Sequence, residues 1–253
     1  MISALRYEFR RMISIRSTWI VSAFYLFLIF ILTYVPLFVG DSPESDGRAR
    51  QTWEGLYSAP SVIFCMVILS TIAAQSFGHE YRYGVIRLTM SQFPKRETVL
   101  LAKTISVLLY AMFMTVVGWS LIGFIGYLAG SDRVATGPGG VTFFGSPAPP
   151  LWKVPVAVAA YVLLVFCLTL LTRNLALGIV IPILMAVMIE PIAGALISLA
   201  KGKLDWLPKS FPMTNFNSWL EGNTGLPHAG LVSAAWVVGL YALAATVFLR
   251  KDA

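Results

Sequence analysis

Long apolar runs, separated by short polar connections, cover most of this 253-residue chain. A helix needs about 20 predominantly apolar residues to cross a bilayer core of about 30 Å. Windows of this kind are Trp19–Val39, Pro60–Phe77, Ile105–Ala129, Trp152–Leu171, a fifth that begins at Leu175, and His228–Leu249. The pattern therefore predicts an all-α polytopic membrane protein with six transmembrane helices, in which residues 1–253 form a single transmembrane domain.

Residues 1–18 have a different pattern, in which apolar and basic positions alternate with the period of a helix. Apolar side chains recur at Ile2, Leu5, Phe9, Met12 and Ile13, while Arg6, Arg10 and Arg11 fall on other sides. Such an amphipathic helix is expected in the inner headgroup layer, with its arginines beside anionic lipid and its apolar stripe at the acyl boundary. A positively charged flank of the first span is the alternative.

The fifth apolar window is interrupted near its end by Glu190 and Pro191. A proline lacks a helical N–H donor and restricts the residue before it, so we expect a helix break near Glu190. Aromatic residues among prolines follow, which indicates re-entrant or extracellular helices over residues 190–227. An ionisable group at membrane depth is a candidate for a substrate path, and capping of the broken helix is the alternative role of Glu190.

The distribution of basic residues predicts the orientation in the membrane. The segments Gly40–Ala59 and Gly130–Pro150 are rich in turn-forming residues and are expected to be external loops. With the N-terminus inside, the cytoplasmic segments contain 12 Lys and Arg residues and the external segments contain 7. We therefore expect a protein of the cell membrane with both termini on the cytoplasmic side. The first apolar run is too long for the core of a cleavable signal peptide.

Composition narrows the possible functions. Hydrophobic residues make up 57% of the chain and charged residues 12%, which excludes an ordinary water-soluble domain. The net charge of +7 comes from clusters beside apolar spans, and such clusters indicate membrane topology rather than nucleic-acid binding. Cys65 and Cys167 lie inside apolar windows without companions at metal-ligand spacing, so no metal site is expected.

Motifs for catalysis or nucleotide binding are incomplete. A zinc motif that began at His79 would need a second histidine where Tyr83 stands. The segment 118–122 lacks the closing glycine of a nucleophile elbow. Gly202 and Lys203 lack the other residues of a phosphate-binding loop. We therefore expect a chain that is not an enzyme and binds no cofactor, so that any ATP would bind to another chain.

The most specific feature is the charged stretch from His79 to Lys103, between the second and third apolar windows. Glu80, Gly84 and Leu88 recur at intervals of four and would share one side if the second span continues as a helix. Pro94 would end that helix, and Lys95-Arg96-Glu97 would begin the next one. A solvated turn with positive charge is the alternative interpretation.

This stretch resembles the cytoplasmic loop of the ABC-2 type permeases, the membrane subunits of ATP-binding-cassette exporters. The resemblance lies in the pattern E-x3-G-x3-L-x5-P-x-R-x6-K, formed by Glu80, Gly84, Leu88, Pro94, Arg96 and Lys103. The amphipathic residues 1–18 resemble the elbow helix of the family. The interrupted fifth window and the aromatic segments after it resemble its re-entrant extracellular helices.

The resemblance implies a function for each part of the chain. Two permease chains, identical or paralogous, would pair in the membrane, and each would dock through residues 79–103 on a cytoplasmic ATPase subunit that binds ATP and Mg. The coupling residues that it implies are Glu80, Arg82, Gly84, Arg87, Pro94, Lys95 and Arg96. The chain departs from the family at Val85 and Ile86, and aromatic residues flank Arg82 on both sides.

The expected function is therefore outward movement of an amphipathic or apolar substrate, such as a drug, a peptide or a lipid-like molecule. One alternative is a membrane sensor or assembly subunit, which docks the ATPase but transports nothing. An ion-coupled carrier is a further alternative, and it is disfavoured because Glu190 is the one acidic residue within a predicted span.

Overall fold

Helices form almost all of the structure. The computed structural model describes residues 2–38, 59–93, 95–128, 136–137, 140–143, 146–147, 153–199, 210–221 and 226–251. The helices are α1 (Ile2–Ser14), α2 (Arg16–Phe38), α4 (Ala59–Tyr83), α5 (Ile86–Gln92), α6 (Arg96–Leu128), α7 (Lys153–Thr172), α8 (Leu175–Leu184), the π-helical η2 (Met185–Ile189), α9 (Glu190–Leu199), α10 (Pro212–Glu221) and α11 (Leu226–Lys251). The prediction of a helical fold is confirmed for these elements.

Within the predicted external loop Gly130–Pro150, the described residues form three short strands. These are β1 (Thr136–Gly137), β2 (Gly140–Phe143) and β3 (Ser146–Pro147), which form an antiparallel sheet in the order β1-β2-β3. Thr136 pairs with Val141, and Thr142 pairs with Pro147. Of the other predicted loop, Gly40–Ala59, all but the last residue lies outside the described residues.

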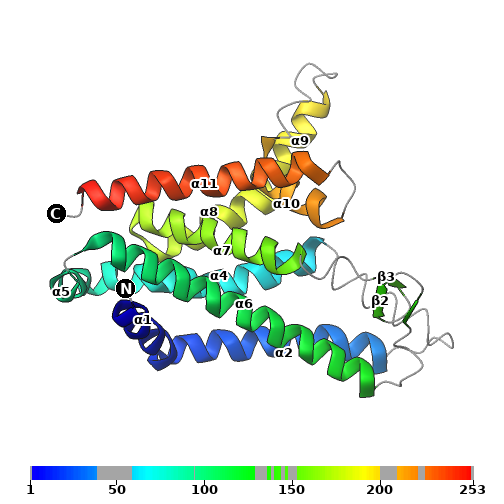
Figure 1. Cartoon of the computed structure of the whole chain (residues 1–253). Helices are drawn as coiled ribbons and strands as arrows, with labels where there is room; N and C mark the ends of the chain where they lie inside the picture. Colours follow the sequence, from blue (N-terminus) through cyan, green and yellow to red (C-terminus); the bar gives the residue numbers. More distant parts are fainter. Residues whose placement is uncertain are drawn as a thin grey trace.

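The long helices run side by side, with α7 in contact with α4, α6, α8 and α11 (Figure 1). The sequence of α7 is apolar on all its sides, as expected for a helix surrounded by others. Phe77 of α4 joins this core, because its ring centroid lies 5.2 Å from that of Phe166 and 5.5 Å from that of Phe248. These tilted and edge-on ring contacts tie α4, α7 and α11 together.

Five of the described helical segments are long and apolar enough to cross a membrane. They are Arg16–Val35, Arg96–Ile122, Pro155–Thr172, Leu175–Ala195 and His228–Arg250. The remaining predicted span, Pro60–Phe77, lies within the 25 residues of α4, which at the usual rise extend about 37 Å. The chain is thus a multi-pass membrane protein, and the count of six spans stays a prediction.

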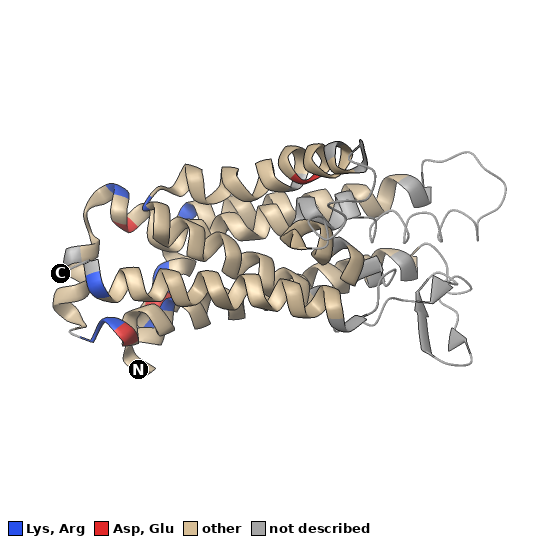
Figure 2. Cartoon of the chain, turned by 90° about the horizontal axis from the view of Figure 1, so that it is seen from above, with Lys and Arg blue, Asp and Glu red and all other residues tan. Residues whose placement is uncertain are grey.

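Most of the charged residues that the structure describes lie at one end of the bundle, where both termini also lie (Figure 2). The middle portions of the long helices carry almost no charge in this view. Large apolar side chains such as Phe27, Phe113 and Val238 are exposed along these portions. An uncharged, apolar outer surface of this kind suits contact with lipid chains.

The predicted helix break near Glu190 has a different form in the structure. The chain stays helical through Glu190, but the π-helical turn η2 precedes it, and the Glu190 N–H donates to the carbonyl of Met185. Such a turn is a known cause of helix bending. Residues 200–209 and 222–225 lie outside the described residues, so the re-entrant arrangement over residues 190–227 stays a prediction.

Candidate coupling site

The charged stretch His79–Lys103 is divided among three helices. Its first residues complete α4, which ends at Tyr83, and a short helix, α5 (Ile86–Gln92), follows. Lys95 precedes α6, which begins at Arg96. Pro94 lies outside the described residues. The stretch is thus helical over much of its length, and α5 lies at the end of the bundle that carries the charges (Figures 1 and 2).

Gly84 ends α4 because its backbone has a positive φ of 67°, a conformation that favours glycine. The predicted shared side of Glu80, Gly84 and Leu88 is wrong for this reason, since the helix does not continue through Gly84. The Glu80 side chain points into the bundle and is 2% exposed, whereas Leu88 is 62% exposed. Gly84 therefore separates a buried acidic residue from an exposed apolar one.

A Gly84→Ala substitution is expected to lower the free energy of unfolding by about 1 to 2 kcal/mol, the usual cost of a left-handed backbone at a residue with a Cβ. The added methyl group would touch nothing, because no atom lies within 4 Å of its position. Gly239→Ala is the matched control, since it also has open space but no positive φ. Thermal unfolding in detergent measures both variants, and equal stability of the two would contradict the expectation.

Four charged side chains from three helices meet next to Thr89 of α5. Glu8 and Arg11 come from α1, Glu80 from α4 and Lys103 from α6. The Lys103 ammonium is fully buried and donates to Glu80 Oε1 at 2.8 Å, to Glu8 Oε2 at 3.0 Å and to the Ser76 carbonyl at 3.3 Å. We call Glu8, Arg11, Glu80 and Lys103 the buried ion cluster.

Arg11 closes the buried ion cluster on the side nearer to solvent. Its guanidinium forms an ion pair with Glu80 and donates to the Ser76 carbonyl at 2.8 Å. A second ion pair, to Glu8, spans 3.6 Å. Two carboxylates and two cations give the cluster no net charge, which offsets much of the cost of removing each group from water.

The cluster connects α1, α4 and α6, and it reaches α5 through Thr89. The Thr89 hydroxyl lies 3.4 Å from Glu80 Oε1 and is buried. The Phe77 ring covers the inner side, with its centroid 5.0 Å from the Lys103 nitrogen. A shift of α5 relative to the bundle would therefore alter the surroundings of a buried carboxylate.

Glu8 is not among the site residues predicted from the sequence, and one side of α1 differs from the predicted one. The face of α1 toward the bundle carries Ala4, Glu8 and Met12, which are buried, whereas Met12 had been expected on the lipid side. The available signal was the single acidic residue of a basic amphipathic segment, together with a lysine, Lys103, beside an apolar span. An ionisable group in such a place needs a partner.

The other predicted coupling residues have different surroundings. Arg82 is exposed and lies 5.7 Å from the centroid of the Tyr83 ring, and Lys95 is exposed. Arg96 is half-buried, with its guanidinium 3.5 Å from the Leu249 carbonyl oxygen. Arg87 is a residue of α5. Of the seven predicted residues, Glu80 alone is in the buried ion cluster, and the coupling role of each stays a prediction.

His79 lies beside this cluster, one position before Glu80, and its ring packs edge-on against Tyr83. Partial burial lowers the pKa of His79, and the nearby positive charges of Arg11 and Arg82 lower it further. The imidazole is therefore neutral near pH 7. It adds no positive charge to this side of α4.

Glu190, at the start of α9, accepts hydrogen bonds from α10. Its Oε1 accepts the Met213 N–H at 2.9 Å, and its Oε2 accepts the Thr214 N–H at 2.7 Å and the Thr214 hydroxyl at 2.8 Å. These amides belong to the first turn of α10, where no helical acceptor exists. Glu190 therefore caps α10, whereas the capping predicted from the sequence was of its own interrupted helix. Pro191 is exposed, and substrate contact by either residue stays a prediction.

The described residues contain no group of three or more His, Cys, Asp or Glu side chains that would hold a metal ion. The buried ion cluster brings two carboxylates together, those of Glu8 and Glu80. Its lysine and arginine already neutralise both carboxylates. The arrangement is therefore suited to holding helices together rather than to binding a cation.

A family model described as ABC-2 family transporter protein matches residues 5–189, which include α5 and the whole buried ion cluster. No curated protein matches the chain. Members of the matched family are membrane components of transporters that work in general with an ATPase partner, and they are generally not catalytic themselves. The match covers more than half of the chain and agrees with its apolar spans, so the chain belongs to the ABC-2 family of transporter proteins.

Proposed function

We propose that the chain is the membrane-spanning permease subunit of an ABC exporter. It moves an amphipathic or apolar substrate outward, such as a drug, a peptide or a lipid-like molecule. A separate cytoplasmic subunit binds ATP and Mg and hydrolyses the ATP, and a second permease chain completes the transporter. The observation that carries this proposal is the contact of α5 with the buried ion cluster through Thr89, at the charged end of the bundle.

The exposed surface around α5 supports a protein contact. Tyr83 is 67% exposed and Leu88 is 62% exposed, and Val85 between them is also exposed. Apolar side chains at the charged end of a membrane protein have neither lipid chains nor a core to cover them, and such patches indicate a protein partner. Residues 79–103 then form the coupling loop, with this surface in a cleft of the ATPase subunit.

The buried ion cluster supports transmission of movement from α5 into the bundle. Thr89 of α5 contacts Glu80, and the short connection at Gly84 joins α5 to the helix that carries Glu80. Glu80 in turn forms ion pairs with Arg11 of α1 and Lys103 of α6. The second oxygen of Glu80, Oε2, is buried without a hydrogen bond in the described structure. An incompletely satisfied polar cluster of this kind has room for a second arrangement, which the ATP-bound partner would favour.

The proposed orientation places α5, α1 and the end of α11 in the cytoplasm of a cell whose plasma membrane contains the protein. The basic residues of the described chain gather at this end (Figure 2). Positive residues favour the cytoplasmic side of a membrane. In this orientation α1 has the position of an elbow helix, and both termini are cytoplasmic.

A Leu88→Glu substitution is expected to lower coupled ATP hydrolysis and substrate export at least about tenfold, because a desolvated carboxylate at the centre of a contact costs on the order of several kcal/mol. Stability should stay within about 0.5 kcal/mol of wild type, since the side chain is exposed. Proteoliposomes that contain the chain with its cognate ATPase measure ATP hydrolysis and the movement of a fluorescent amphipathic substrate.

Ser14→Glu is the matched control, because it adds the same charge at an exposed position at the end of α1. Wild-type coupling in Leu88→Glu would contradict docking through α5. ATPase binding in a wild-type preparation that never moves substrate would favour the sensor or assembly subunit. Export that stops when ion gradients collapse at constant ATP would instead favour an ion-coupled carrier.

A further inference from the structure

The helix α1 presents three chemically different sides, of which the buried ion cluster uses one. The side toward the bundle carries Glu8 and Met12. A second side is apolar and exposed, with Ile2, Phe9 and Ile13. The third side is basic, with exposed Arg6 and Arg10. The second and third sides have no role in the proposed coupling.

The apolar side of α1 forms one wall of a cavity of about 570 Å³ between α1, α2 and α6. Representative lining residues are Phe9, Ile13, Ala23, Leu26, Phe113 and Val117. The lining residues of α2 and α6 belong to the candidate spans Arg16–Val35 and Arg96–Ile122. The cavity therefore lies within the hydrocarbon layer, and its volume is in the range of about 300 to 1,000 Å³ typical of ligand sites.

Two hydroxyl groups in the cavity wall, those of Ser22 and Tyr110, already have hydrogen-bond partners. The Ser22 hydroxyl donates to the Thr18 carbonyl at 2.6 Å, and the Tyr110 hydroxyl lies 2.6 Å from the same Ser22 oxygen. Because Ser22 uses its proton on Thr18, Tyr110 donates to Ser22. These groups offer a ligand no unpaired donor, so the cavity favours a hydrocarbon chain.

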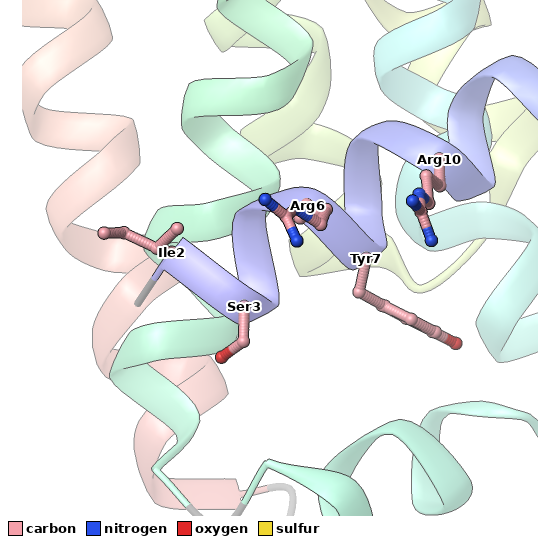
Figure 3. A pocket seen from close by; sticks show the side chains of 5 residues that line it. All are labelled: Ile2, Ser3, Arg6, Tyr7 and Arg10. Carbon is pink, nitrogen blue, oxygen red and sulfur yellow. The ribbon is translucent and has the colours of Figure 1, made fainter.

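The basic side of α1 borders a second hollow, of about 410 Å³, lined by Ile2, Ser3, Arg6, Tyr7 and Arg10. Figure 3 shows these side chains following one another along α1, with Ser3 and Tyr7 pointing to the same side. Neither Arg6 nor Arg10 forms an ion pair with any residue that the structure describes. The one acidic residue of α1, Glu8, is buried and bound to Lys103 and Arg11. Two guanidinium groups are thus left for an external anion, and phosphate matches their geometry.

The two hollows are neighbours because of the helical spacing. Arg6 follows Ile2 by four residues and precedes Phe9 by three, and Arg10 precedes Ile13 by three. Residues at these spacings lie side by side on a helix, about 5 to 6 Å apart at their Cβ atoms. A phosphate at Arg6 and Arg10 would therefore be about one turn from the mouth of the apolar cavity.

We propose that α1, α2 and α6 form a binding site for an anionic phospholipid, whose phosphate contacts Arg6 and Arg10 and whose acyl chain fills the apolar cavity. The anionic headgroup matches the hollow at Arg6 and Arg10 in charge, and the acyl chain matches the apolar cavity in polarity. A bound lipid also holds α1 against the bundle, in the position where its Glu8 and Arg11 pair with Glu80 and Lys103 in the buried ion cluster. Binding to the docked position of α1 stabilises that position by linkage. This inference depends on the membrane location and not on coupling through α5.

The test compares phosphatidylglycerol with phosphatidylcholine of identical acyl chains, titrated into the purified full-length chain in detergent and followed by native mass spectrometry. We expect tighter binding of phosphatidylglycerol. Arg6→Gln or Arg10→Gln should weaken it about fivefold each, and the double variant about 25-fold, on the usual contribution of a basic residue near anionic lipid. Phosphatidylcholine binding should change little in these variants.

Arg82→Gln with Arg250→Gln is the matched control, because it removes the same charge from exposed positions outside α1. Ala23→Phe tests the cavity by filling it, and it should weaken both lipids about equally. Equal affinity of the wild type for the two lipids, or an equal loss in the control, would overturn the proposal. It would also fall if Ala23→Phe left lipid binding intact, or if that variant changed the oligomeric state instead, which would make the cavity an interface between copies.

Discussion

A Lys103→Met variant is expected to lose about 3 to 5 kcal/mol of unfolding free energy, because removal of one partner leaves a buried charge uncompensated. Lys103 is 0% exposed, and its ammonium donates to both Glu8 and Glu80. Methionine retains a similar length and volume but supplies no charge. After the substitution, Arg11 alone would face two buried carboxylates. Chemical or thermal unfolding in detergent micelles measures the loss.

Lys95→Met is the matched control, since Lys95 precedes the same helix but is exposed, and its loss should be within about 0.5 kcal/mol of zero. Adding Glu8→Gln to Lys103→Met should restore part of the stability, because the remaining pair, Arg11 and Glu80, is then balanced. A Lys103→Met loss no larger than that of Lys95→Met would show that the cluster does not hold α1, α4 and α6 together.

The apolar windows predicted the long helices because hydropathy is a local property of the chain. The window Trp152–Leu171 corresponds to α7 (Lys153–Thr172), and His228–Leu249 lies inside α11 (Leu226–Lys251). The end of α5 at Gln92 agrees with the restriction that Pro94 places on Phe93, whose backbone is extended, and the start of α6 at Arg96 agrees with the acidic Glu97 in its first turn. These signals lie within a few residues of the boundary that they determine.

The contacts of the candidate site could not be predicted from the sequence, because they join distant parts of the chain. Glu8 and Lys103 are separated by 95 residues, and no local pattern indicates their pairing. Lys103 is the last residue of the charged stretch, and the sequence does not distinguish a solvated lysine there from a buried one. The helix α4 also continues six residues past the predicted end at Phe77, since polar residues extend a helix equally well until Gly84 ends it.

The amphipathic pattern of α1 does not determine which side of the helix packs against the bundle. The sequence separates apolar from basic positions, but it does not reveal which positions face protein. A buried acidic residue, Glu8, replaces the apolar contact that a simple two-sided helix would make there. Its cost is acceptable only because Arg11 and Lys103 lie opposite, and their positions depend on the packing of α4 and α6.

A Glu190→Ala variant is expected to lose about 2 to 4 kcal/mol of unfolding free energy, because removal of the carboxylate leaves the first turn of α10 without its cap. α10 begins at Pro212, and Phe211 before it has no side-chain acceptor, so Glu190 supplies the cap from another helix. The Met213 amide is buried, and without Glu190 it loses its only acceptor among the described residues. The Thr214 amide is nearer to solvent, so water replaces part of its bond.

Glu190→Gln separates capping from a direct role in transport. The amide oxygen of glutamine can accept one of the two backbone N–H groups, but its NH2 group would face the other, so we expect about half of the alanine loss. Glu97→Ala is the control for a carboxylate in a first helical turn, and because Glu97 is exposed it should cost about 0.3 to 1 kcal/mol. If export falls in Glu190→Gln only as far as stability does, capping accounts for the residue. Wild-type stability with abolished export would instead place Glu190 on the substrate path, because the helix cap would then be dispensable and the charge would not.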